Sequence, residues 1–199
     1  MSLLVDSTFV TFPKIPRWNR EIIVTEKIDG TNAQIYIPDV APIVFRSGRE
    51  VPFLVGSRNR WVLPENDNHG FAKWAYSNPE LILSLGPGRH FGEWWGQGIQ
   101  RGYGLKEKRF SLFNTTKWTT PPEGMYVVPV LYQGPMYWSV VDSVEDLIED
   151  LRCSGSMAAP GYMKPEGIVI FHTASGHSYK VTLENDHIPK KEAIKQNII

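Results

Sequence analysis

Short stretches in which apolar and polar residues alternate recur along this chain, and this period of two limits its fold more than any other feature. Residues 21–26 and 33–37 follow the pattern on either side of Lys27-Ile28-Asp29-Gly30. Such alternation is typical of strands with one buried face, so the two stretches are predicted to be strands arranged like a hairpin around the lysine. Further strands are predicted at 43–46, 53–57, 89–95, 109–114, 125–132, 167–172 and 178–183.

Helical patterns are fewer and shorter. Residues 69–77 and 79–85 are predicted to form short helices. The clearest helix is predicted at 143–152, with Ser143 as its cap and Gly155 beyond its end. Its apolar face would consist of Val144, Leu147, Ile148 and Leu151.

The composition allows one sizeable core, because 42% of the 199 residues are hydrophobic and 21% are charged. No repeat or linker-like stretch divides the chain, so residues 1–199 are expected to form a single α+β domain. No apolar run approaches the length of a membrane span, and the first residues are not those of a secretory signal. The single cysteine, Cys153, excludes an internal disulfide and a zinc site built on several thiolates, which favours a cytoplasmic location.

The 21 basic and 21 acidic residues give a net charge of zero. Proteins that bind nucleic acid strongly are usually more basic, so the balance argues mildly against an independent, strong grip on a polynucleotide. The basic residues are nevertheless clustered, and a neutral total can hide one positive face. The clusters contain Arg46, Arg49, Arg58 and Arg60, and then Arg101, Lys106, Lys108 and Arg109.

Lys27 stands between a predicted strand and the pair Asp29-Gly30. A glycine here allows the backbone to turn tightly and to approach a phosphate group closely. Asp-Gly is also a common hairpin turn, in which Lys27 would simply be exposed. The motif by itself therefore fits a nucleophilic lysine and a turn lysine equally well.

Three later residues have the same two interpretations. Arg58 closes a predicted strand, where it is either a surface residue or a ligand for phosphate or sugar. Glu93 lies among aromatic residues, which is a costly place for a carboxylate unless a partner compensates its charge, although it could also lie at the rim of a core. Phe113 is either a core aromatic residue or a platform on which a base stacks.

Two candidates lie near the C-terminus. Glu166 precedes an apolar strand, where it could hold a metal ion or occupy a turn, and Lys180 lies on a strand as a functional or a half-exposed lysine. Other chemistries have less support. The chain has no phosphate-binding loop ending in Gly-Lys-Ser/Thr and no Gly-x-Ser-x-Gly nucleophile turn, and Cys153 has no histidine beside it in the sequence.

Taken in order, these motifs resemble those of the covalent nucleotidyltransferase superfamily, which contains polynucleotide ligases and mRNA capping enzymes. Within it the chain is most similar to the RNA ligase domain family, including small forms from bacteriophages. The resemblance extends from about residue 24 to residue 183. It implies a ligase-type fold of mainly antiparallel sheets with flanking short helices.

The resemblance also implies a role for each residue. Lys27 would become adenylylated, within a signature that includes Asp29 and Gly30 among the nucleotide-binding residues. The remaining roles are adenine recognition for Glu26, the ribose and the nucleic-acid end for Arg58, a ribose hydroxyl for Glu93, base stacking for Phe113, the catalytic metal for Glu166 and the α-phosphate for Lys180.

Two departures from the family pattern concern the C-terminal part. The last motif usually has two lysines separated by one residue, but here Thr182 follows Lys180 at that spacing, or Ser178 precedes it. Only 16 residues follow Leu183, so no C-terminal oligonucleotide-binding domain is expected.

The resemblance implies an ATP-dependent RNA ligase that uses Mg²⁺ or Mn²⁺ and acts on nucleic acid with 5′-phosphate and 3′-hydroxyl ends. RNA is the favoured substrate, and the protein is expected to be a monomer, with a separate nucleic-acid-binding protein as a possible partner. DNA ligation and GTP-dependent capping are alternatives within the superfamily. A non-sealing nucleotide-binding module, or a structural domain whose motifs coincide by chance, are alternatives outside it.

Overall fold

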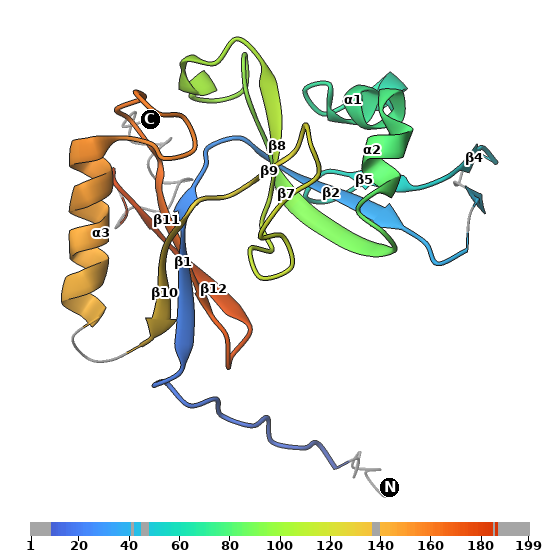
Figure 1. The fold of residues 1–199 in the computed structure, drawn as a ribbon. Coiled ribbons are helices and arrows are strands. Elements are labelled where there is room, and N and C mark those ends of the chain that lie inside the picture. The colour runs from blue at the N-terminus through green and yellow to red at the C-terminus, as the bar shows by residue number, and fades with distance from the viewer. Residues whose placement is uncertain (1–8, 41, 45–47, 137–139, 185, 187–199) are drawn as a thin grey trace, which may run out of the picture.

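The computed structural model describes residues 9–40, 42–44, 48–136, 140–184 and 186. Two mainly antiparallel sheets form the two halves of the molecule, as Figure 1 shows, and helices cover the outer face of each half. The α+β fold class with mostly antiparallel sheets and few short helices is confirmed. No helix among the described residues is both long and apolar enough to cross a membrane.

The smaller half is a four-stranded sheet in the order β10-β1-β11-β12, and all of its strand pairs are antiparallel. Its strands are β1 (Glu21–Lys27), β10 (Val130–Pro135), β11 (Gly167–His172) and β12 (His177–Thr182). Helix α3 (Val140–Ser154) covers one face, where Leu151 packs with Ile22, Val24 and Ile168 of the sheet.

The larger half is a six-stranded sheet in the order β6-β5-β2-β7-β8-β9, in which only the β8–β9 pair is parallel. Its strands are β2 (Thr31–Ile37), β5 (Leu54–Gly56), β6 (Trp61–Val62), β7 (Gly88–Gly96), β8 (Lys108–Leu112) and β9 (Tyr126–Val127). The remaining elements are the small β3–β4 pair (Ile43–Val44 and Glu50–Val51) and the 3₁₀ turns Pro64–Asn66 and Gly102–Gly104.

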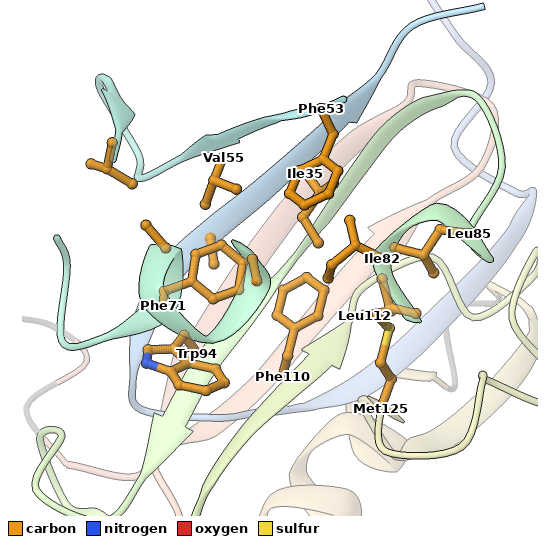
Figure 2. Close-up of a cluster of buried hydrophobic side chains, with 14 of the residues drawn as sticks. Ile35, Phe53, Val55, Phe71, Ile82, Leu85, Trp94, Phe110, Leu112 and Met125 are labelled. Carbon is orange, nitrogen blue, oxygen red and sulfur yellow. The ribbon is translucent and has the colours of Figure 1, made fainter. Parts of the chain in front are cut away.

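Two short helices, α1 (Phe71–Ser77) and α2 (Pro79–Leu83), cover the outer face of the larger sheet. Figure 2 shows the aromatic core between them and the sheet, where the Phe71 ring lies 5.4 Å from Trp94 and 5.1 Å from Phe110 between centroids. The Asp67 carboxylate accepts hydrogen bonds from the first free backbone N–H groups of α1. This cap supports a helix too short to be stable alone.

The predicted hairpin around Lys27 is wrong. Strand β1 pairs with β10 and β11, whereas β2 pairs with β5 and β7, so residues 27–31 cross from one sheet to the other. The predicted single strand at 125–132 is wrong for a related reason, because Pro129 interrupts it and the chain crosses back between β9 and β10. The chain thus changes sheet twice within the described residues, at neighbouring places, since the Glu26 N–H donates to the Pro129 carbonyl at 2.9 Å.

Helix α3 differs from its prediction at its beginning. It begins at Val140, so Ser143 lies inside the helix and is not its cap. Its end agrees with the sequence, because Gly155 has φ of +81° and its N–H donates to the Leu151 carbonyl. Within the predicted strand 43–46, only Ile43–Val44 is a strand, and residues 45–47 lie outside the described part.

Candidate active site

The two sheets enclose a cavity of about 620 Å³ that reaches the point where the chain first crosses between them. Residues from both sheets line it, including Thr25 and Lys27 of β1, Val169 of β11 and Glu93 of β7. Lys27 is the last residue of β1, immediately before the crossing. The turn lysine considered from the sequence is therefore a lysine in the wall of a cavity.

Lys27 Nζ donates a hydrogen bond to Glu166 Oε2 and forms an ion pair with it. Both side chains are mostly shielded, with 23% and 18% of their surface exposed. Register explains the contact, because Lys27 lies opposite Gly167 in the β1–β11 pair. A side chain at Gly167 would meet the Val181 carbonyl oxygen at 2.1 Å, so only glycine allows this close approach of β12.

Glu93 reaches the same place from the larger sheet. It is 7% exposed and accepts a hydrogen bond from Asn32 Nδ2 at 3.2 Å. The pKa of the Glu93 carboxyl is raised to about 7. Burial is the main cause and the nearby Glu166 carboxylate adds to it, while the charge of Lys27 opposes the shift. One lysine and two carboxylates from different sheets thus interact electrostatically.

Glu26 is adjacent to Lys27 in sequence but makes its contacts outside this group. It is 1% exposed, and its carboxylate accepts hydrogen bonds from Ser156 Oγ at 2.5 Å and from the backbone N–H groups of Met157 and Ala158 at 2.8 and 2.9 Å. Burial raises the pKa of Glu26, and these three donors oppose that shift. Its described contacts thus attach the loop that follows α3 to β1, directly beside the lysine. They leave the predicted contact with adenine untested.

Sequence reasoning missed two residues that hold the backbone after Lys27. The hydroxyl of Tyr103 accepts a hydrogen bond from the Asp29 N–H at 2.8 Å, and Arg101 Nε donates to Asp29 Oδ2 at 3.2 Å. Tyr103 is 2% exposed, its pKa is raised by burial, and its backbone has φ of +52°. The only sequence signal was the run Arg101-Gly-Tyr103-Gly, in which glycines flank an aromatic residue.

Gly30 has no space for a side chain, since a Cβ there would meet the Trp94 carbonyl oxygen at 2.5 Å.

Phe113 lies just past β8 and lines the cavity. Its side chain is 41% exposed, as a platform for a ligand ring would be.

Lys180 and Arg58 lie farther out. Lys180 is exposed and opposite Val169, so it shares the cavity face of the smaller sheet without lining the cavity. Arg58 is exposed in the turn between β5 and β6, away from the cavity lining. The hydroxyl of Thr182, at the position of the missing second lysine, donates to the Glu184 carbonyl at 3.0 Å.

Comparison with known proteins agrees with this geometry. Residues 20–182 match the model of the RNA ligase family. The chain belongs to the RNA ligase family. This confirms the resemblance found in its motifs.

The fold is similar to solved structures of the Naegleria gruberi RNA ligase. A mutant of that protein with ATP and Mn has a TM-score of 0.55 and 19% identity, over 82% of this chain and 49% of that chain. Another mutant, without ligand, has a TM-score of 0.54 and 20% identity, over 82% of this chain and 50% of that one. This RNA ligase family member thus spans about half the length of these structures. No curated protein matches the sequence.

Proposed function

We propose that this RNA ligase family member is an ATP-dependent RNA ligase that forms a covalent lysine–AMP intermediate at Lys27. The observation that carries the proposal is the position of Lys27 at the crossing between two sheets, in a cavity, with Glu166 bonded to its amine and Glu93 nearby. A mostly shielded amine that is paired with Glu166 and lies in the field of Glu93 is costly to maintain for a structural role alone. The family membership of residues 20–182 supports the same conclusion.

In the first step, Lys27 Nζ attacks the α-phosphorus of ATP. The nitrogen–phosphorus bond forms while the bond from the α-phosphorus to the bridging oxygen breaks, and pyrophosphate leaves. The amine must lose a proton to attack, and Glu166 Oε2 already accepts a hydrogen bond from it. Glu166 is therefore in position to receive that proton.

In the later steps, a 5′-phosphate oxygen of the nucleic acid attacks the phosphorus of the bound AMP, and the nitrogen–phosphorus bond breaks. A 3′-hydroxyl then attacks the activated 5′-phosphate and AMP leaves. RNA is the proposed nucleic acid. DNA ends, a GTP-dependent capping reaction, or a module that binds nucleotide without sealing are the alternatives.

The residues proposed to hold ATP are those implied by the family resemblance, and several of them line the cavity. We propose that the adenine stacks on Phe113, that Glu93 binds a ribose hydroxyl, and that Gly30 lets the backbone approach the α-phosphate. Lys180 would reach the phosphates from the cavity face of β12, and Arg58 would act on the nucleic-acid end. Glu26, which lines the cavity, would help to recognise the adenine, and Asp29 would act on the nucleotide from its place beside Gly30.

A divalent ion such as Mg²⁺ or Mn²⁺ fits this donor set. No group of three or more His, Cys, Asp or Glu in the described part of the chain could hold a metal by itself. Mg²⁺ is usually bound by one or two carboxylates together with substrate phosphates and water, which is what Glu166 and the triphosphate could provide. When bound, the ion would neutralise charge on the phosphates.

Nucleotide labelling tests the proposal. Protein incubated with ATP that carries ³²P at the α-phosphate should become labelled, and Lys27→Ala should abolish the label because it removes the attacking nitrogen. Lys106→Ala, which removes an exposed lysine outside the cavity lining, should label like the unaltered protein. Undiminished labelling of Lys27→Ala would refute the proposal, and labelling by GTP in place of ATP would favour the capping alternative.

A further inference from the structure

The inner face of the larger sheet carries a row of aromatic residues that continues outward from the cavity. Phe113 and Phe91 are neighbours, because the Phe113 N–H donates to the Phe91 carbonyl at 2.9 Å. Phe91 on β7 lies opposite Gln34 on β2. On the far side of β2, Gln34 lies opposite Gly56 of β5, and Gly56 lies opposite Trp61 of β6. We call Phe113, Phe91 and Trp61, together with Gln34 that lies between Phe91 and Trp61, the aromatic row.

All members of the aromatic row share one face. Opposite residues in antiparallel strands point to the same side, and the sequence neighbours of Gln34 and Trp61 point into the core on the other side. Gly56 shows this directly, since a Cβ there would meet Gln34 Cγ at 2.8 Å and Trp61 Cε3 at 3.0 Å. Both side chains therefore lie over the bare backbone of β5.

An arginine is stacked beside the row. The Arg89 guanidinium lies 4.6 Å from the centre of the Tyr36 ring and 5.5 Å from that of Trp61, and Arg89 also lines the cavity. No described carboxylate forms an ion pair with it. An arginine attracted to ring faces in this way still has N–H groups that can bind a phosphate. Arg58, in the turn just before Trp61, adds a second exposed positive charge at the outer end.

The charges on this face suit a polyanion. Among the inward-facing residues of β2, β5, β6 and β7, Glu93 is the only acidic one, and it lies at the cavity end. Phe91 is 51% exposed in a position where it has no core role. Rings that present their faces beside positive charges are the usual means of holding a single strand without reading its sequence.

We infer that the aromatic row, with Arg89 and Arg58, binds the single-stranded RNA segment whose end enters the cavity. Four steps between strands separate Phe113 from Trp61, which is about 19 Å at about 4.8 Å per step, so the row can hold a short run of nucleotides. Bases stack on Phe91 and Trp61, and the arginines contact phosphates. The inference rests on the proposed function for its choice of RNA.

The test is binding of a fluorescein-labelled single-stranded oligouridylate, followed by fluorescence anisotropy without ATP. Trp61→Ala should weaken binding roughly 5- to 150-fold, the range expected for the loss of one stacking contact. Arg89→Ala should weaken it as well and reduce the slope of log affinity against log salt by about 0.7, as for one lost phosphate contact on a single strand. Tyr179→Ala is the matched control, because Tyr179 is 57% exposed on β12, outside the row.

Two further variants separate binding from folding. Trp61→Phe keeps a ring and should retain most of the affinity, and Arg89→Gln removes the charge with a smaller change of shape; both are checked by thermal melting. Unchanged affinity in all row variants, an equal loss in Tyr179→Ala, or no binding of the oligonucleotide by the unaltered protein at low salt would overturn the inference. Because the assay contains no ATP, a failure of Lys27 labelling would count against the proposed function without altering this result.

Discussion

The two sheets of this RNA ligase family member are built differently, and they contribute different residues to the candidate site. The larger sheet has a dense aromatic core in which the rings of Phe71, Trp94 and Phe110 contact one another. The smaller sheet relies on aliphatic side chains under α3, several of them only partly buried. The half with the aromatic core contributes Glu93 and Phe113 to the cavity, and the half with the aliphatic core carries Lys27 and Glu166.

The two buried glutamates show the same contrast. Glu26, on the smaller sheet, also lines the cavity, but its carboxylate accepts three hydrogen bonds from residues 156–158. Glu93, on the larger sheet, faces the cavity with the Asn32 side chain and the Gly30 backbone as its donors. Glu93 therefore has more free capacity to accept hydrogen bonds from a ligand than Glu26 has.

The largest expected effect is a loss of stability when a side chain is truncated in the core of either sheet. Phe71→Ala should lower the free energy of unfolding by about 3–5 kcal/mol, because it leaves a cavity among rings that cannot close. Leu151→Ala, under α3, should cost about 2–3 kcal/mol, since its partly exposed neighbours can move into the space. Urea denaturation measures both values. Equal losses would mean that the two halves are packed alike and would remove the comparison.

The next effect concerns Glu93 and pH. Its pKa is raised in the folded protein to about 7 from an ordinary 4.5, so the protonated form is favoured by folding. Its contribution to stability is complete below about pH 4.5 and is lost as the pH rises through about 7, a change of about 3 kcal/mol. Glu93→Gln cannot titrate, so its unfolding free energy should fall less than that of the unaltered protein over this range.

Unfolding in urea at several pH values measures this difference. Glu123→Gln, at an exposed loop position, is the control and should follow the unaltered protein. Parallel pH profiles for Glu93→Gln and the unaltered protein would show that Glu93 is already ionised when the site is empty.

The smallest expected effect concerns the contacts that position the crossing segment, residues 27–31, between the two sheets. Arg101→Ala removes the contact with Asp29 and should slow labelling of Lys27 about tenfold, because the backbone after the lysine becomes less ordered. Arg101→Lys should restore only part of the rate, since lysine lacks the planar set of donors. Arg152→Ala, on the exposed side of α3, should have no effect. If Arg101→Ala leaves the labelling rate unchanged, the contact between Arg101 and Asp29 does not help to position Lys27 for the reaction.

Sequence patterns predicted most strands and the apolar face of α3, because alternation and helical spacing record which side of an element is buried. They did not predict strand partners, and so gave a hairpin at Lys27 and a single strand at 125–132 where the chain changes sheet. Motif order identified Lys27, Glu93, Phe113 and Glu166, which the structure brings to one cavity or its edge. The contacts of Glu26 with Ser156 and of Asp29 with Tyr103 span 130 and 74 residues and left no local signal.

The two crossings between the sheets have a consequence for engineering this chain. Residues 31–127 leave the smaller sheet after Lys27 and return just before Val130, at adjacent backbone positions of β1 and β10. In topology the larger half is an insert whose ends meet, placed within a small sheet that carries Lys27 on β1 and Glu166 directly before β11. Segments whose two ends lie close together tolerate replacement best, so we expect the larger half to be replaceable as one unit while the sheet that carries Lys27 stays intact.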